Sequence, residues 1–308
     1  MIDTIVAGLE TKDINGIIKS TKMRGTRSWS TASIQRDYDL GNLRIKVIEN
    51  AKTNLYAVTL EGSLNKYIHG NNVKSCTRLE IKEAITEISD LIEQPIYDAT
   101  VYRIDIGRVF VTEHTPSLYN LKLSHSGRYK KSMYNDFDTL YFSVSNRELI
   151  FYDKAKEVKP KAYIPKELIF DNLLRYEFRL RRKISEYLKR QVIVRDLFNK
   201  EFYCILLNMY EGEYFKVVKN PQPILSVKPS TKILTNFFAL WGIKHFGGIH
   251  NAREMIKDLS KEHGLNAVEK KRLLDKVDLI ATHQDILDSD DLIEELNRKV
   301  RRAVEFYL

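Results

Sequence analysis

The sequence predicts an α+β protein in which an antiparallel sheet is backed by helices on its apolar face. Two patterns carry this prediction. Residues 175–181 alternate between apolar and charged side chains, which is the period of a strand with one buried face. Residues 78–92 place apolar side chains at helical spacing, as an amphipathic helix requires. The sheet should therefore have one face under helices and one face rich in charge.

The composition is typical of a globular protein with a polyanionic partner. Of 308 residues, 43% are hydrophobic and 30% are charged, and this length suits about two domains. The formal net charge of +9 favours nucleic acid over an anionic membrane surface. The chain has no apolar run of membrane-spanning length and no signal peptide, which predicts a cytoplasmic protein without membrane contact. Two cysteines are too few for a disulfide scaffold or a zinc site.

Other elements follow from the same periods. Strands are expected at 1–8 and 99–111, hairpins at 43–60 and 139–152, a short helix near 164–170 and a long helix at 194–210. The order hairpin, helix, strand occurs twice, which suggests a repeated arrangement. Residues 23–35 and 117–138 show no clear period, and the second stretch is expected to be an irregular excursion over a substrate groove. Residues 63–72 are expected to form a polar loop.

A domain boundary is predicted near residue 220, where Pro221, Pro223 and Pro229 punctuate the chain. Helices are expected beyond it at 231–244, 249–263, 267–279 and 290–307. The prediction is one α+β domain at 1–219 and a small helical domain at 220–308. The helical domain could bind duplex DNA, a host helicase or a second copy of the chain as a homodimer, and the sequence leaves these open.

The polar face of the predicted sheet collects Glu61, Asp105, Tyr152, Lys154 and Glu177. Carboxylates of this kind can hold Mg²⁺ or Mn²⁺ beside a phosphate, and we expect Asp105, Glu177 and Glu61 to be the metal ligands. A tyrosine hydroxyl is a competent nucleophile, and an ammonium nearby can stabilise a charged transition state. A cross-strand ladder of salt bridges accounts for the same charges, with Tyr152 as an ordinary half-buried strand residue.

Basic side chains on the same strands are candidates for DNA contact. A glycine, Gly107, lies beside Asp105 and is expected to leave room for a ligand. The polar loop could hold a phosphate or the DNA backbone. The expected DNA-binding residues are Arg103, Arg175, Arg179, Arg181, Lys66 and Asn71.

Three short motifs occur in an order and spacing that carry a resemblance. They are Tyr-Arg-Ile-Asp at 102–105, Phe-Tyr-Asp-Lys at 151–154 and Leu-Arg-Tyr-Glu-Phe-Arg at 174–179, preceded by the stretch 57–72. In this combination the chain resembles replication initiators of the filamentous-phage gene II type. It is similar in pattern to the rolling-circle initiators of plasmids. The resemblance covers roughly residues 43–214.

The resemblance implies an initiator-like nuclease fold and a site-specific DNA nickase and strand transferase. It places the nucleophile that forms a 5′-phosphotyrosyl link at Tyr152, with Lys154 beside it, and acidic positions for metal binding or proton transfer at Asp105 and Glu177. The partner it implies is origin DNA, either single-stranded or as a cruciform or supercoiled duplex. Many rolling-circle nucleases carry a His-apolar-His strand, which is absent here, so carboxylates should dominate any metal site, with His69 and His114 as minor candidates.

Two other functions are compatible with these residues. A non-catalytic nucleic-acid-binding protein could use the basic face and its tyrosines as a stacking platform. A metal-dependent nuclease could use water as the nucleophile, and Tyr152 would then be incidental.

Overall fold

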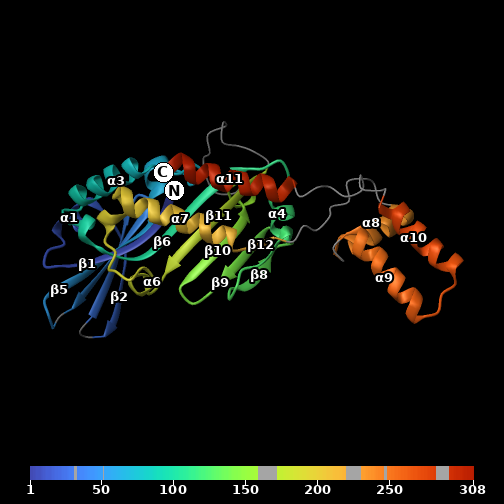
Figure 1. The fold of residues 1–308 in the computed structure, drawn as a ribbon. Coiled ribbons are helices and arrows are strands. Elements are labelled where there is room, and N and C mark those ends of the chain that lie inside the picture. Colours follow the sequence, from blue (N-terminus) through green and yellow to red (C-terminus); the bar gives the residue numbers. More distant parts are fainter. Residues whose placement is uncertain (31–32, 51, 159–171, 220–229, 246–247, 282–290) are drawn as a thin grey trace. The chain divides into compact units, whose positions relative to one another are not determined.

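One ten-stranded antiparallel sheet forms the body of the protein (Figure 1). The computed structural model describes residues 1–30, 33–50, 52–158, 172–219, 230–245, 248–281 and 291–308. The strand order is β2-β3-β4-β5-β1-β6-β11-β10-β9-β8. The strands are β1 (Ile2–Thr11), β2 (Lys22–Ser30), β3 (Ser33–Leu40), β4 (Leu43–Asn50), β5 (Leu55–Ser63), β6 (Thr100–Val111), β8 (Lys130–Tyr134), β9 (Thr139–Ser143), β10 (Arg147–Asp153) and β11 (Leu173–Arg181). A separate two-stranded sheet pairs β12 (Val218–Lys219) with β7 (Leu123–His125).

Helices cover the apolar face of the sheet, and Figure 1 shows α3, α7 and α11 on the same side of it. The helices of this part are α1 (Asn15–Ser20), α2 (Leu64–His69), α3 (Arg78–Leu91), α4 (Pro116–Lys122), α5 (Lys154–Val158), α6 (Ile184–Leu188), α7 (Lys200–Phe215) and α11 (Asp291–Tyr307), with 3-10 turns η1 (Ile96–Asp98) and η3 (Val194–Phe198). The core of this layer is aromatic. Tyr176 stacks on Phe151 with centroids 4.6 Å apart, and the Tyr176 hydroxyl donates to the Tyr210 carbonyl of α7. The predicted α+β class is therefore confirmed.

The clearest strand and helix predictions are confirmed, while stretches without a clear period were misread. Residues 23–30 lie in β2 and residues 33–35 lie in β3, and residues 117–138 hold most of α4 and all of β7 and β8. The expected polar loop at 63–72 begins with α2, whose first turn is capped by the Ser63 side chain. The predicted helix 194–210 is a 3-10 turn followed by α7. The short helix expected near 164–170 lies outside the described residues.

The two predicted hairpin–helix–strand units occupy mirrored places in the sheet. The first supplies β4, β5 and β6, and the second supplies β9, β10 and β11. The sheet runs β4-β5 to β6 on one side and β11-β10-β9 on the other, with β6 and β11 paired at the middle. The mirrored order is broken by β1, which lies between β5 and β6.

The chain divides into two compact units, and their boundaries differ from the predicted domains. One unit holds Met1–Lys219 together with Glu295–Leu308, and the other holds Asn220–Glu294. The predicted break at 220 is therefore present, but the last predicted helix belongs to the first unit. The buried side of α11 explains this, because Leu296, Val300 and Val304 are each at most 2% exposed. The second unit contains α8 (Thr231–His245), α9 (Ile249–Glu262) and α10 (Ala267–Ala281).

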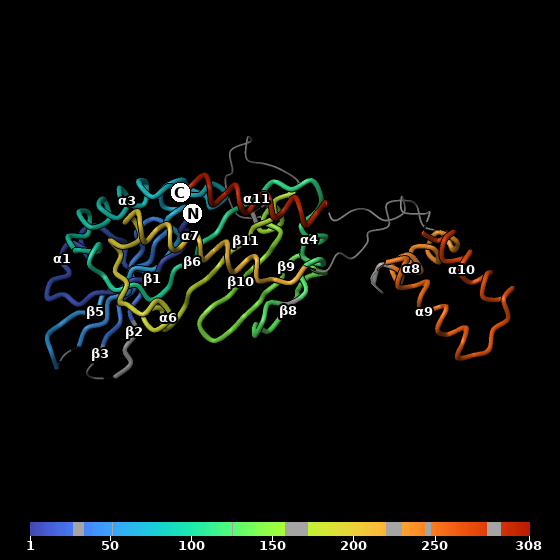
Figure 2. Tube along the Cα trace, viewed as in Figure 1, coloured from blue at the N-terminus to red at the C-terminus, as the bar shows by residue number. Residues whose placement is uncertain are grey.

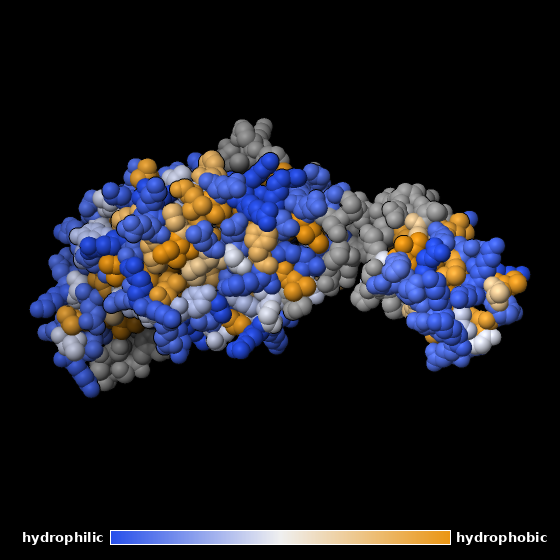
Figure 3. All heavy atoms as spheres, in the orientation of Figure 1, coloured by the Kyte–Doolittle hydropathy of each residue, from blue (hydrophilic) through white to orange (hydrophobic). Residues whose placement is uncertain are grey.

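Polar contacts fix α11 to the first unit as well. The Tyr214 hydroxyl of α7 donates to Asn297, and the Tyr307 hydroxyl donates to the Ser75 carbonyl. The amino group of Met1 donates to the carbonyl of Cys76, which follows Ser75 in the chain. The two labelled ends of the chain therefore both lie beside residues 75–76 (Figure 2). In the space-filling view from the same side, apolar side chains gather over α7, where Ile205 is 50% exposed (Figure 3).

Candidate active site

Strand pairing brings the predicted catalytic residues onto the face of the sheet opposite the α7 layer. Glu177 of β11 lies opposite Gly107 of β6 and Ile150 of β10. Two residues before Glu177 on β11, Arg175 lies opposite Tyr152 of β10. Because side chains alternate along a strand, Tyr152, Arg175 and Glu177 project from one face, while Tyr176 projects into the core. Glu61 and Asp105 project from that same polar face by the registers of β1 with β5 and β6.

Tyr152 and Glu177 form the centre of the site. The Tyr152 hydroxyl donates to Glu177 Oε1 at 3.0 Å. Two guanidiniums hold the same carboxylate, through Arg175 Nε at 2.5 Å from Oε1 and Arg179 Nη2 at 2.8 Å from Oε2. Burial by itself would raise the pKa of Glu177, but these guanidiniums outweigh it and hold the pKa at about 2. Glu177 is therefore ionised at neutral pH.

The phenol of Tyr152 is protonated in this resting arrangement. Burial raises the pKa of Tyr152 well above its usual range, and the Glu177 carboxylate acts in the same direction against the Arg175 guanidinium. A phenol becomes a strong nucleophile when it loses its proton. The contacts at this site therefore orient the hydroxyl and keep it protonated.

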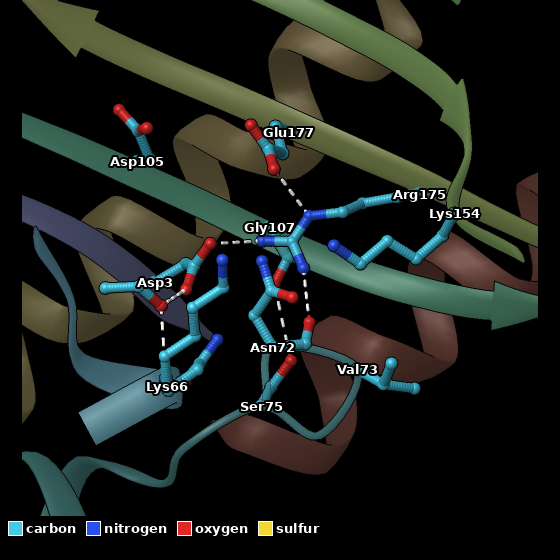
Figure 4. A network of polar contacts seen from close by, with 12 residues as sticks. Asp3, Lys66, Asn72, Val73, Ser75, Asp105, Gly107, Lys154, Arg175 and Glu177 are labelled. Carbon is cyan, nitrogen blue, oxygen red and sulfur yellow. Dashed lines mark hydrogen bonds and ion pairs between the residues drawn. The ribbon is translucent and has the colours of Figure 1, made fainter. Parts of the chain in front are cut away.

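Arg175 is the hub of the network and is fully buried (Figure 4). Its Nη2 donates to Asp3 Oδ2 at 2.5 Å, and its Nη1 donates to the Asn72 carbonyl at 2.5 Å. The other Asp3 oxygen accepts from the Ser63 hydroxyl. We expected Arg175 to contact DNA, and this is wrong for the described conformation, because carboxylates and the 70–76 loop enclose its guanidinium. Arg175 instead positions Glu177.

Gly107 makes room for that guanidinium. A Cβ at this position would lie 3.0 Å from Glu177 Cγ and 3.1 Å from Arg175 Nη2. The sequence-based expectation was that the missing side chain leaves space for a ligand. The space is present, but the protein's own arginine fills it.

Lys154 comes directly after β10, at the first position of α5, and is fully buried. We expected Lys154 on the strand, on the same face as Tyr152. It lies on the helix instead, but its side chain still comes close to the Tyr152 ring. Lys154 Nζ lies 5.7 Å from the centroid of the Tyr152 ring and pairs with Glu157. Figure 4 shows this side chain extending toward the Arg175 guanidinium. Burial, with the Arg175 charge in addition, lowers the pKa of Lys154.

Asp105 is the second buried carboxylate of this face. It accepts from Arg103 Nε at 2.8 Å and Nη2 at 2.6 Å, and Arg179 Nε lies 3.3 Å away. Burial raises the pKa of Asp105 to about 6 despite these two guanidiniums. Arg179 thus bridges Asp105 and Glu177, so the cross-strand salt bridges that the sequence allowed as an alternative are present.

The three carboxylates expected to hold a metal do not come together. Glu61 lies across β1 from β6 and pairs with Lys46 of β4 at 2.6 Å. In the part of the chain that the structure describes, no group of three His, Cys, Asp or Glu side chains could hold a metal ion. His69 lies 3.8 Å from Glu80 of α3 rather than beside Asp105. The described residues therefore do not fit a metal site made by protein ligands alone.

The other predicted DNA contacts divide into two groups. Arg103, Arg179 and Arg181 keep 33%, 26% and 42% of their side chains exposed while pairing with carboxylates. Lys66 is partly exposed. Asn71 is buried, and its side chain accepts from the amides of residues 73 and 74, so it shapes the loop and the expectation of a DNA contact is wrong.

Asp3 and Asn72 are parts of the site that sequence reasoning missed. Asp3 stands as a lone carboxylate in the apolar run of β1, which is the same signal that singled out Asp105. That signal could have identified it. Asn72 accepts from Arg175 through its backbone carbonyl, and a pattern of side chains in the sequence cannot predict a backbone contact.

A comparison with protein-family models matches residues 1–200 to the family described as the N-terminal part of the phage replication-associated gene II protein. The chain belongs to this family. It is accordingly a phage replication initiator of the filamentous-phage gene II type, as the three motifs indicated. The matched region contains Asp3, Tyr152 and Glu177 and excludes the helical unit and α11. A search of curated proteins found no match. No helix in the described ranges is long and apolar enough to cross a membrane.

Proposed function

We propose that this initiator nicks origin DNA at a specific site and transfers the strand through a covalent link to Tyr152. The observation that supports the proposal best is the hydrogen bond from the Tyr152 hydroxyl to Glu177, whose carboxylate is kept ionised by two guanidiniums. This arrangement fixes the direction of a phenol on an arginine-rich sheet face. A phosphodiester needs such a nucleophile beside cationic groups.

In the proposed reaction, the Tyr152 oxygen bonds to phosphorus and the bond from phosphorus to the 3′-oxygen breaks. The 5′-phosphate stays on tyrosine. The phenol gives up its proton to water, and the departing oxygen takes one proton from water to become a free 3′-hydroxyl that primes synthesis. The reverse attack by a 3′-hydroxyl rejoins strands and releases Tyr152.

The surrounding residues have separate roles in this proposal. Glu177 orients the hydroxyl, but its pKa lies far below that of the phenol, so it is a poor final acceptor for the proton. Lys154 stabilises negative charge on the tyrosine oxygen and the phosphate. Arg103, Arg179 and Arg181 bind phosphates by exchanging their present carboxylate partners for the DNA backbone.

Mg²⁺ or Mn²⁺ stays in the proposal as a component of the protein–DNA complex. Magnesium is commonly bound by one or two carboxylates, with substrate phosphates and water completing its coordination. We assign the metal ion no step of the reaction, because Asp105 and Glu177 already form ion pairs with arginines. A host helicase and a second copy of the chain stay predictions for the helical unit, to be tested by the mass of the protein in solution with and without helicase.

The test uses supercoiled plasmid carrying the origin, incubated with the protein and Mg²⁺ or Mn²⁺. A nickase of this kind leaves protein covalently attached to the 5′ end. A hydrolase leaves a free 5′-phosphate, and a binding protein leaves DNA intact, so either result contradicts the proposal.

Tyr152→Phe should abolish the adduct while DNA binding persists, because only one oxygen is lost. Tyr102→Phe is the matched control, because it removes the same oxygen from another strand tyrosine, one that is 53% exposed on β6 and packs beside Gly8 of β1. If Tyr152→Phe still forms an adduct, Tyr134 and Tyr141 are the next candidates. Tyr129 is disfavoured because its hydroxyl donates to Glu213 of α7.

A further inference from the structure

A hollow on the polar face lies beside the Tyr152 site and takes no part in the proposed reaction. Its volume is about 510 Å³, within the range of small-molecule sites. Strands β8, β9 and β10 supply its walls. The residues that matter are Ser132, Tyr134, Thr139, Tyr141, Ser143 and Glu148.

Strand register links the hollow to the nucleophile. Tyr152 of β10 lies opposite Thr139 of β9, and Thr139 lies opposite Tyr134 of β8. Neighbouring strands are about 4.8 Å apart, so these two residues lie about 5 and 10 Å from Tyr152 along one row. Phosphates of one strand of duplex DNA are about 3.4 Å apart along the axis, and an unpaired strand can extend further per nucleotide. An unpaired strand with its phosphate at Tyr152 would therefore reach the hollow within about three nucleotides or fewer.

The lining chemistry fits a nucleobase and disfavours a phosphate. The rings of Tyr134 and Tyr141 pack edge to face, with centroids 5.7 Å apart, and Tyr134 is 56% exposed. Such rings provide a surface on which a base can stack. Around them are hydroxyls and the Glu148 carboxylate, and neither Lys nor Arg is among the described lining residues. A carboxylate repels phosphate but accepts from the amino groups of bases.

Glu148 also connects the hollow to the phosphate-binding arginines. Its carboxylate accepts from Arg181 Nη2 at 2.7 Å and lies 3.3 Å from the Ser143 hydroxyl. The cationic row and the aromatic hollow are thus adjacent parts of one surface. A single strand lying on it would place its backbone over the arginines and turn a base toward the tyrosines.

We propose that the β8–β9–β10 hollow binds one unpaired base of single-stranded DNA next to the scissile phosphate. The inference rests on the proposed function in taking the ligand to be DNA. It adds that the strand is held near Tyr152 by base stacking as well as by charge, so the initiator requires the DNA to be melted at this point.

The experiment measures binding separately from cleavage. Labelled decamers of deoxycytidine, of deoxyadenosine and of abasic residues are titrated against the full chain carrying Tyr152→Phe. Tyr134→Ala and Tyr141→Ala are added singly, and Phe306→Ala serves as an exposed aromatic control on α11. Decamers with bases should bind about tenfold or more tightly than the abasic decamer, since stacking of one base on an aromatic ring has an effect of this order.

Each tyrosine variant should lower affinity for the base-containing decamers toward the abasic value and leave the abasic affinity unchanged. Tyr141→Phe should restore binding, because the ring is retained. Equal binding of all decamers, or an equal loss on all of them, would overturn the inference.

The outcome is distinguishable from failure of the proposed function. If the wild-type protein forms the 5′ adduct but shows no preference for bases, the nickase stands and the hollow is not a base site. If bases are preferred through Tyr134 and Tyr141 but no adduct forms, the hollow stands and the nicking proposal fails.

Discussion

Replacing Glu177 with glutamine should separate the charge of this residue from its shape. Glutamine keeps an oxygen that can accept from Tyr152, but it removes the carboxylate that Arg175 and Arg179 share. Arg175 is fully buried, so it would keep only Asp3 as a charged partner among the described residues. Breaking a buried ion pair by removing one partner typically costs about 3–5 kcal/mol.

The pKa of Glu177 gives an independent magnitude. It is lowered from the ordinary 4.5 to about 2, and each pKa unit corresponds to about 1.4 kcal/mol. Ionised Glu177 thus contributes about 3 kcal/mol to folding. Because the folded pKa is depressed, this contribution is complete above pH 4.5 and is lost as the pH falls toward 2.

The assay is urea unfolding at several pH values, with nicking measured in parallel. Glu177→Gln should be about 3 kcal/mol less stable at pH 7 and should lose less further stability between pH 4.5 and 2 than the wild type. Glu186→Gln is the control, because Glu186 forms an exposed pair with Lys183 and should change stability by less than about 1 kcal/mol. A Glu177→Gln protein with wild-type stability and acid sensitivity would refute the electrostatic account of the site.

Three further changes test other parts of the site. Gly107→Ala should cost about 1–3 kcal/mol in thermal unfolding, because its Cβ would meet Arg175, whereas Gly25→Ala, with open space around it, should cost less; equal costs would contradict this packing. Affinity for DNA should rise as the pH drops through about 6, because Asp105 gains a proton and releases Arg103 and Arg179 to bind phosphates. Asp105→Asn should remove that pH dependence, and a pH–affinity profile that keeps it assigns it to another group. Lys154→Ala should lower the single-turnover nicking rate by about 10²–10³ with DNA affinity little changed, and a wild-type rate would exclude its electrostatic role.

Local patterns predicted the strands and the side of the sheet on which Tyr152 and Glu177 lie. The alternation at 175–181 was sufficient, because a period of two fixes which side chains share a face. Alternation cannot tell which charged residue of that face is covered. Arg175 is enclosed because Asp3 and the loop at Asn72, which are 172 and 103 positions away, close over it.

The predicted metal ligands failed to assemble for a related reason. Glu61 and Asp105 do share a face, but β1 is inserted between their strands, and nothing in the local pattern of β1 indicates that place. Lys46 and Arg103 then satisfy the two carboxylates separately. The face of a side chain could be read from sequence, whereas its neighbours across the sheet could not.

The return of α11 to the first unit has a consequence for how this protein is made. During synthesis, β1 to α7 leave the ribosome long before α11, with the whole helical unit emerging between them. Until then Tyr214 of α7 lacks Asn297, and the carbonyl of Ser75 lacks Tyr307. Ser75 lies three residues after Asn72, whose carbonyl holds Arg175. The contacts of the loop that encloses Arg175 are therefore completed only after α11 has left the ribosome, so the nascent chain would acquire its finished Tyr152 site late in synthesis.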